Sequence, residues 1–373
     1  MNTEMMNRES DNHEFSMPPR VLLGPGPSMV DPRVLGAMAM PLVGHLDPAF
    51  LEIMDSTQEL LRRVFETGNR FTIPVSGTGS AAMEAAVASL VEPGDRVLVC
   101  VNGYFGLRIA EMARRYGALV ETIKRPWGEV FTPQDVDRAL DQRPADVVAI
   151  VHAETSTGAL QPLDEIPAIV HGHGAILIVD AVTSLGGLPV GVDEFEIDAC
   201  YSAAQKCLSC PPGASPVTLS DRALEKMRGR KVGVRSWYLD LTLLEKYWGR
   251  ERQYHHTAPI STLYALHAGL RIAVEEGLEN RWNRHLENAQ LLWDGLEAMG
   301  MQMLVPREYR IPSLTTVKVP EGSDELTIRK LLLGRYNIEI AGGLGELAGK
   351  VWRVGLMGYS SRRENVLLLL AAL

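Results

Sequence analysis

The sequence contains few cysteines and no long apolar run. Only four of its 373 residues are cysteine, at positions 100, 200, 207 and 210. That number is too small for a disulfide scaffold, so we expect a reducing, cytoplasmic compartment. The longest apolar stretch, residues 366–373, falls far short of the roughly 18 residues that a membrane-spanning helix needs. The first 20 residues are polar and lack the apolar segment of a signal peptide.

An excess of basic residues is also missing. The 37 Lys and Arg residues are outnumbered by 46 Asp and Glu residues, which gives a net charge of -9. Proteins that bind nucleic acids or anionic membranes release counterions by presenting a basic surface. We therefore expect neither a nucleic acid nor a membrane as partner. Small anionic ligands need only a few local charges and are compatible with this balance.

Short apolar runs alternate with helical patterns over much of the chain. We expect buried strands at residues 71–75, 96–101, 146–151 and 175–179, and helices at residues 81–91, 107–116, 133–142 and 164–171. This alternation predicts an α/β fold, in which helices cover a mostly parallel sheet. Two longer helical patterns, at residues 261–277 and 280–299, then precede a smaller α/β unit. We expect an N-terminal arm (1–20), a large domain (21–276) and a small domain (277–373).

Three strand ends carry polar groups that suggest a binding site, because ligands of open α/β sheets bind beyond the carboxyl ends of strands. Residues 76–80, Ser-Gly-Thr-Gly-Ser, follow the first strand and precede a helix. The free N–H groups of such a turn attract anions, although an ordinary strand–helix turn has the same composition. The turn matches neither the G-x-G-x-x-G pattern nor a P-loop, which disfavours a nucleotide-binding dehydrogenase. A non-enzymatic binding module is a further alternative.

Asp180 and Lys206 follow later strands. A carboxylate at a buried strand end needs a hydrogen-bonding or cationic partner, so Asp180 is either structural or pairs with a cationic ring nitrogen. Lysines are usually solvated, but one among small apolar residues has a lowered pKa and can act as a nucleophilic amine. An anion turn, a carboxylate and an amine are together what pyridoxal phosphate requires. The sequence therefore predicts this cofactor.

From Leu22 onward the sequence resembles the class V aminotransferases of fold type I, and among them the alanine/serine–glyoxylate aminotransferases. The resemblance rests on residues 23–28, 76–80, 154–158, 179–187, 202–206, 254–257, 342–345 and 352–355. It implies a pyridoxal-phosphate enzyme that moves the amino group of alanine or serine to glyoxylate or pyruvate. A ureidoglycine–glyoxylate transaminase is the alternative within the class. A cysteine desulfurase would need a mobile cysteine near the C-terminus, and none follows Cys210.

The resemblance also implies roles for individual residues around the cofactor. Lys206 would form the Schiff base and carry protons, and Asp180 would keep the pyridine nitrogen protonated. The phosphate would be held by Thr78, Gly79, Ser80 and Gln205, together with Tyr254 and Thr257 from a partner subunit. The last two residues imply a homodimer with active sites at the subunit interface.

Four further residues would complete the site. Phe105 would stack on the cofactor ring, where close relatives often carry Trp, and Thr155 would lie near the cofactor's O3′. Arg353 would bind the substrate carboxylate, and Gly26 would restrict the pocket to small amino acids. Ser80 also departs from some relatives, which have His there. No metal is expected, because Cys207 and Cys210 have C-x-x-C spacing without a second such pair.

Overall fold

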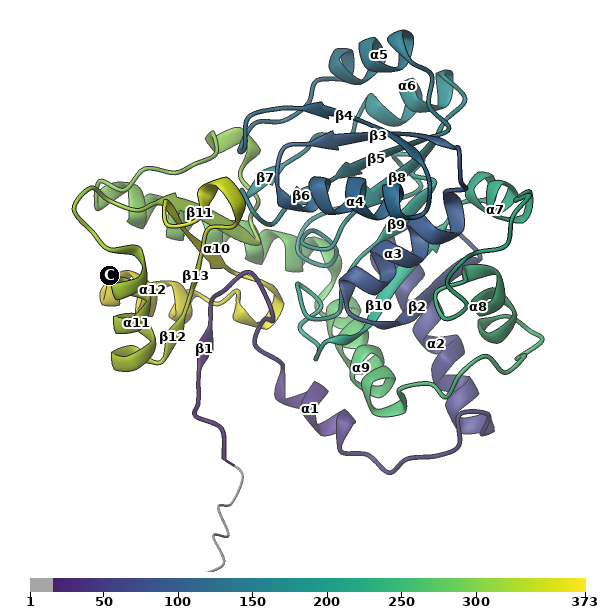
Figure 1. Cartoon of the computed structure of the whole chain (residues 1–373). Coiled ribbons are helices and arrows are strands. Elements are labelled where there is room, and N and C mark those ends of the chain that lie inside the picture. The colour runs from purple at the N-terminus through teal and green to yellow at the C-terminus, as the bar shows by residue number, and fades with distance from the viewer. Residues whose placement is uncertain (1–15) are drawn as a thin grey trace, which may run out of the picture.

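A seven-stranded sheet forms the centre of the molecule. The structure, a computed structural model, describes residues 16–373. The strands follow the order β2-β10-β9-β8-β5-β3-β4 (Figure 1). Their bounds are β2 Phe71–Gly77, β3 Arg96–Val101, β4 Leu119–Lys124, β5 Val147–Val151, β8 Ile176–Asp180, β9 Ala199–Tyr201 and β10 Gly213–Leu219. Only β10 runs antiparallel to its neighbours, so the prediction of a mostly parallel sheet is confirmed.

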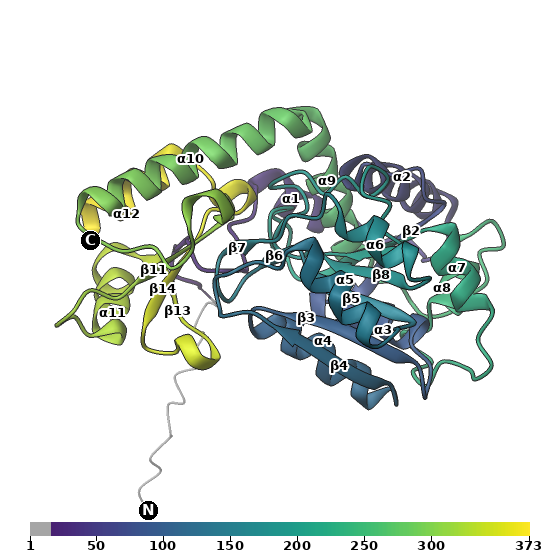
Figure 2. The ribbon, with the colours of Figure 1, turned by 90° about the horizontal axis from the view of Figure 1, so that it is seen from above.

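Helices cover both faces of this sheet. On one face lie α3 (Gly79–Leu90) and α4 (Tyr104–Arg115), with α7 (Asp221–Arg228) and α8 (Leu241–Trp248) beside α3. The opposite face carries α2 (Pro48–Phe65), α5 (Pro133–Gln142), α6 (Ile166–Gly172) and α9 (Ile260–Glu276), as Figures 1 and 2 show. Helix α1 (Pro32–Met38) packs on α9. Helix α5 spans the predicted residues 133–142. A capping box formed by Thr132 and Asp135 stabilises its first turn.

A second, smaller sheet follows the long helix α10 (Leu278–Ala298), which runs along one side of the molecule in Figure 2. It consists of β11 (Leu314–Lys318), β14 (Val351–Gly355) and β13 (Ala341–Gly342), in that order. Around it lie α11 (Glu325–Tyr336), α12 (Arg363–Ala372) and the turns η1 (Arg307–Tyr309), η2 (Gly345–Leu347) and η3 (Gly358–Ser360). Strand β1 (Val21–Leu22) pairs with β12 (Ile338–Glu339), and β6 (Ala153–Glu154) pairs with β7 (Ala159–Leu160).

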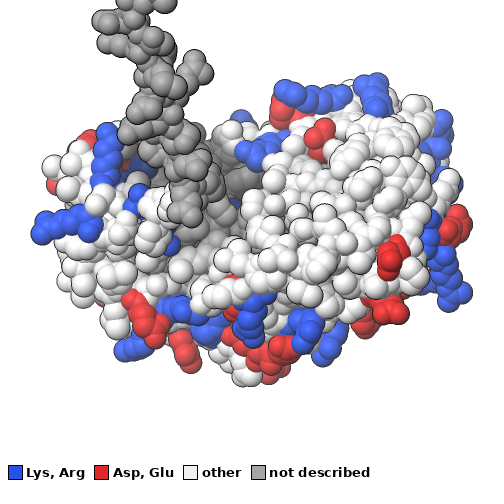
Figure 3. Space-filling model, turned by 90° about the horizontal axis from the view of Figure 1, so that it is seen from below, with Lys and Arg blue, Asp and Glu red and all other residues white. Residues whose placement is uncertain are grey.

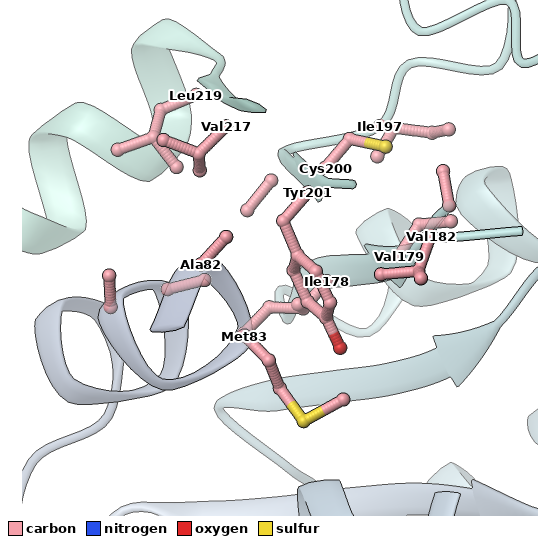
Figure 4. Close-up of a cluster of buried hydrophobic side chains, with 14 of the residues drawn as sticks. Ala82, Met83, Ile178, Val179, Val182, Ile197, Cys200, Tyr201, Val217 and Leu219 are labelled. Carbon is pink, nitrogen blue, oxygen red and sulfur yellow. The ribbon is translucent and has the colours of Figure 1, made fainter. Parts of the chain in front are cut away.

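Two large hydrophobic clusters match these two sheets. The larger one joins the seven-stranded sheet to its helices, and Figure 4 shows the Tyr201 ring in it, packed among Ala82, Met83 and Ile178. The other joins Leu23 and Leu292 to residues of the C-terminal strands and helices. The domain limits at 276 and 277 stay a prediction. Residues 1–15 of the predicted arm lie outside the described residues.

The structure contains elements that the strand–helix alternation did not indicate. Helix α2 and the antiparallel strand β10 were not predicted, and neither was the edge strand β4, whose exposed positions interrupt its apolar ones. Across residues 16–373, no helix has both the length and the apolar character needed to cross a bilayer.

We predict that Leu292→Ala lowers the free energy of unfolding by about 2–5 kcal/mol, because it removes a fully buried side chain from the second cluster. Urea unfolding followed by circular dichroism measures this loss. The control is Leu286→Ala in the same helix, where the side chain is 38% exposed and the expected loss is well below 1 kcal/mol. Equal losses for both variants would contradict the packing described here.

Candidate active site

The predicted anion turn, carboxylate and amine lie at one edge of the sheet. The turn follows β2, Asp180 ends β8, and Lys206 lies in the loop after β9. Close contacts join the three segments, since a Cβ atom placed on Gly79 would lie 2.9 Å from the Cβ of Ala203 and 3.4 Å from Cγ2 of Val182. Glycine is therefore required at position 79 for the turn to approach the two loops that flank the carboxylate and the amine.

Asp180 is a buried carboxylate without a cationic partner. Its Oδ1 accepts a hydrogen bond from the Val182 N–H at 2.9 Å, and its Oδ2 accepts one from the Tyr201 hydroxyl at 3.1 Å. No Lys, Arg or His of the described chain forms an ion pair with it. Burial is the main cause that raises the pKa of Asp180 to about 7. A cationic N–H group bound at this carboxylate would favour its charged form.

Lys206 points back toward the loop that follows β1. Its Nζ donates a hydrogen bond to the carbonyl of Pro25. A Cβ on Gly26 would lie 2.8 Å from both Cδ and Nζ of Lys206, and the φ of Gly26 is +109°, so any side chain here would clash and be strained. Burial, followed by the charge of Arg353, lowers the pKa of Lys206 to about 8. About a tenth of this amine is therefore uncharged at pH 7, far more than for a solvated lysine.

The turn at the start of α3 has unused hydrogen-bonding capacity. Thr78 occupies the N-cap position but its side chain makes no capping hydrogen bond, which leaves N–H groups at the positive end of a 12-residue helix. Ser80 Oγ accepts a hydrogen bond from Arg108 at 3.1 Å, which brings a guanidinium to the turn. The Oε1 atom of Gln205 is buried and has no hydrogen-bond partner in the described chain. The free N–H groups and the guanidinium suit a bound phosphate better than a closed structural turn, and the Gln205 amide can add a donor there only through its Nε2.

Arg353 and Thr155 meet beneath the second sheet. Arg353 lies on the central strand β14, is 5% exposed, and donates from Nε to the Gly342 carbonyl at 2.8 Å and from Nη1 to the Thr155 carbonyl at 3.1 Å. It forms no ion pair with any residue that the structure describes. Burial lowers its pKa to about 10. The Thr155 hydroxyl forms a hydrogen bond with the Thr183 hydroxyl, close to Asp180 in the chain.

Phe105 is positioned by a buried carboxylate that the sequence analysis had not singled out. Glu154 accepts hydrogen bonds from the Phe105 N–H at 3.1 Å and from the N–H and hydroxyl of Ser156 at 3.0 and 2.6 Å. It thereby caps the start of α4, and burial raises its pKa. The guanidinium of Arg108 lies 4.8 Å from the centre of the Phe105 ring. The sequence offered one sign of Glu154: it is an acidic residue that follows the fully apolar strand β5 by three positions.

Tyr254 and Thr257 lie on the surface, in the loop before α9. Tyr254 is 57% exposed, and its ring centre lies 5.2 Å from that of His45. Within the described chain, no hydrogen bond joins either residue to the turn at residues 78–80. Both residues are thus exposed on the surface of the chain, whereas Asp180, Lys206 and the turn at residues 78–80 lie at the carboxyl ends of the strands.

Cys207 and Cys210 follow Lys206 closely in the sequence, and both side chains are buried. Burial raises the pKa of the Cys207 thiol to about 11 and that of Cys210 to about 12. Both thiols are therefore protonated near neutral pH, and each donates to a nearby backbone carbonyl.

The donor set fits pyridoxal phosphate. A buried carboxylate without a cation suits a protonated pyridine nitrogen, an amine of lowered pKa suits an aldehyde, and the uncapped α3 turn with the nearby Arg108 guanidinium suits a phosphate. The site and the doubly covered sheet thus define a pyridoxal-phosphate enzyme. The family model of the class-V aminotransferases matches residues 22–366, and the chain belongs to this family. It is an aminotransferase of fold type I, and its cofactor is pyridoxal 5′-phosphate.

Known members of the family are similar over nearly the whole chain. The rat alanine–glyoxylate aminotransferase is 44% identical over 362 residues, which cover 96% of this chain and 87% of the rat protein. The crystal structure of an alanine–glyoxylate aminotransferase from Nostoc sp. superposes with a TM-score of 0.96 at 54% identity, covering 98% of this chain and 97% of that one. The ureidoglycine–glyoxylate aminotransferase of Bacillus subtilis gives a TM-score of 0.95 at 45% identity, covering 96% and 93%.

We predict that Asp180→Asn stabilises the cofactor-free protein at pH 8 by up to about 4 kcal/mol. The shift of the Asp180 pKa from 3.8 to about 7 makes ionisation of the folded state costly. Wild-type stability should therefore fall as the pH rises from about 4 to about 7 and stay level above. The variant avoids this penalty: its Oδ1 can still accept from the Val182 N–H, and its Nδ2 can donate to the Tyr201 hydroxyl oxygen.

Urea unfolding between pH 4 and pH 8 tests this prediction. The stabilities of the variant and the wild type should approach to within about 1 kcal/mol near pH 4, where Asp180 is protonated in the folded chain and roughly half protonated in the unfolded chain. The control is Asp141→Asn, whose side chain is 71% exposed and whose effect should be small at every pH. A gap that is independent of pH would contradict the burial of a carboxylate without a cation.

Proposed function

We propose that the protein transfers the amino group of a small amino acid, alanine or serine, to glyoxylate or pyruvate. The observation that carries this proposal is the buried Arg353, a guanidinium without a carboxylate partner in the described chain, whose charge influences Lys206. A single such group suits a substrate with one carboxylate near the reacting amine. The names of the rat and Nostoc relatives, which specify alanine and glyoxylate, support the same donor and acceptor.

The chain's own residues supply binding, orientation and proton transfer. When bound, pyridoxal phosphate provides an aldehyde and a ring that accepts electron density from the substrate Cα. Lys206 Nζ takes up and returns protons, because a pKa of about 8 keeps both of its forms populated. Asp180 would hold the proton on the ring nitrogen. Thr78, Gly79, Ser80 and Gln205 would hold the phosphate, Phe105 would cover the ring, and Thr155 would lie near its O3′.

Substrate size would be limited at Gly26. The close approach of Lys206 to this glycine leaves no room for a side chain there, so the loop of residues 25–27 forms a wall beside the amine. Arg353 retains Nη2 without a hydrogen-bond partner among the described residues, and with Nη1 this atom can bind a carboxylate. A wall and a single cation together favour a small amino acid over a dicarboxylic one.

A ureidoglycine–glyoxylate transaminase is the second candidate. The relevant observation is the 43% identity over 98% of this chain with the Bacillus subtilis enzyme of that name, which shares the glyoxylate acceptor. The two candidates differ in the amino donor only, so a comparison of donors separates them.

A homodimer in the cytoplasm accounts best for the surface and the cysteines. Large apolar side chains are exposed in the loop and helix before α2 and near α9, and Figure 3 shows that the face seen from below is mostly uncharged. They include Leu35, Met40, Leu42, Leu46, Trp237 and Tyr254, which are 47–68% exposed. Such a face favours association with a second copy, which would receive Tyr254 and Thr257. All four cysteines are buried free thiols.

We predict that the purified protein converts alanine or serine with glyoxylate faster than any other tested pair, and that Lys206→Ala lowers this activity at least about 10³-fold by removing the proton carrier. A matrix of amino donors and oxo-acid acceptors, with ureidoglycine among the donors, measures this. The folded state of the variant is checked by circular dichroism. Preference for ureidoglycine would favour the second candidate, and a lack of activity with every donor tested would refute both.

We predict that Arg353→Lys raises the KM for alanine or serine at least about 10-fold, because lysine cannot form the two parallel hydrogen bonds of a guanidinium. Steady-state kinetics with saturating acceptor measures this. Arg335→Lys, at an exposed position of α11, is the control and should leave KM unchanged. An unchanged KM in the first variant would exclude Arg353 as the carboxylate ligand.

A further inference from the structure

A chain of hydrogen bonds links the turn after β2 to the loop that carries Tyr254 and Thr257. Ser76 Oγ lies 2.7 Å from His256 Nε2, and His256 Nδ1 lies 2.8 Å from His255 Nδ1. His255 Nε2 in turn lies 3.1 Å from the carbonyl oxygen of Trp237. This series of hydrogen bonds therefore begins two residues before Thr78 and ends in the segment before α8.

The chemistry of its ends fixes the proton positions along this chain when both imidazoles are neutral. The Trp237 carbonyl only accepts, so His255 must donate from Nε2 and its Nδ1 carries a lone pair. His256 then donates from Nδ1 and accepts at Nε2, and the Ser76 hydroxyl donates to it. All four ring nitrogens of the two histidines have a partner in this arrangement. It holds the loop in one orientation, because neither ring can flip without breaking two hydrogen bonds.

Both ends of the chain are held in place. Ser76 lies in β2, where it pairs with Ala214 in the ladder to β10, so its position is set by the sheet. His255 is 5% exposed, and its ring stacks on Trp237 with centres 4.1 Å apart and planes 10° from parallel. The Tyr238 ring packs against His256 with centres 5.0 Å apart. The imidazoles are thus fixed by packing as well as by hydrogen bonds.

In the loop of residues 254–257, the two central side chains face inward and the two outer ones are exposed. His255 and His256 point inward to the sheet edge, and Tyr254 and Thr257 on either side of them are exposed. A buried histidine and a half-buried one, between two exposed hydroxyl-bearing residues, fix the direction in which those hydroxyls point. Surface hydroxyls that bind a ligand on another molecule need this orientation, because their own chain provides no ligand to order them.

We propose that His255 and His256 are positioning residues that orient Tyr254 and Thr257 for the phosphate of the partner subunit. This inference rests on the proposed homodimer with shared sites. It assigns a function to Ser76 as well. This residue precedes the phosphate turn of its own subunit, and it anchors the loop whose Tyr254 and Thr257 would bind the phosphate of the partner subunit. The two sites of the dimer are then connected through the hydrogen bonds between Ser76, His256 and His255.

Two substitutions of His256 separate the links of the chain. His256→Asn keeps a polar atom near the position of Nδ1 and loses the link to Ser76, whereas His256→Gln keeps one near Nε2 and loses the link to His255. Because orientation needs both links, each variant and Ser76→Ala should raise the Kd for pyridoxal phosphate at least about 10-fold. The Kd is measured by quenching of tryptophan fluorescence, and the dimer is checked by analytical ultracentrifugation.

A matched control comes from another histidine–serine pair. His267 Nε2 lies 2.9 Å from Ser56 Oγ, between α9 and α2 and away from the phosphate turn. His267→Gln and Ser56→Ala remove a hydrogen bond of the same kind and should leave the cofactor Kd unchanged. An equal rise in Kd for these controls, or a wild-type Kd for the His256 variants, would overturn the proposal. If the wild type itself bound no pyridoxal phosphate, the proposed function would fail first.

Hybrid dimers test whether the effect crosses the interface. One chain carries Lys206→Ala and the other carries His256→Asn, so that only the His256→Asn chain retains a lysine for borohydride trapping of the cofactor. Its site receives Tyr254 and Thr257 from the chain with an intact His256. The labelled fraction of Lys206 at limiting cofactor, read by mass spectrometry, should match that of a hybrid of Lys206→Ala and wild-type chains. Labelling as weak as in the His256→Asn homodimer would overturn the proposal.

Discussion

The candidate active site depends on shielding two ionisable groups from water at the carboxyl ends of parallel strands, one buried and one partly buried. Burial raises the pKa of Asp180 and lowers that of Lys206, so both pKa values lie close to neutral pH. Neither shift would survive in a solvated loop. The rest of the fold serves this constraint, since the apolar strands, the Tyr201 ring and the helices on both faces exclude water from the carboxyl ends of β8 and β9.

The second sheet completes the site by bringing a cation to it. Arg353 comes from a strand near the C-terminus and reaches the Thr155 carbonyl, while Glu154, the residue before Thr155, caps the helix that carries Phe105. One short segment after β5 therefore aligns the residue proposed to bind the substrate with the residue proposed to cover the ring. This arrangement explains why Glu154 is buried despite the cost: its oxygens are satisfied by backbone N–H groups and a serine hydroxyl.

The Nostoc and Bacillus subtilis enzymes share this architecture over almost the whole chain, at 54% and 45% identity. Enzymes whose names specify different amino donors thus share one fold. Differences in donor must come from a few contacts in the pocket, where small changes in shape or hydrogen bonding alter the transition-state energy. Under the proposed function, the choice of donor would depend on side chains near Gly26 and Arg353.

The sequence alone determined the mostly parallel sheet, the cofactor and the residues at the strand ends, because these follow from local periodicity and from the residue types after each apolar run. Only the tertiary structure decided which distant groups meet. The antiparallel insertion of β10, the hydrogen bond from Tyr201 to Asp180, the cap that Glu154 places on α4 and the link from Ser76 to His256 all join residues that no local pattern relates. Such contacts depend on how the elements pack, and a pattern of neighbouring residues carries no information about packing partners far along the chain.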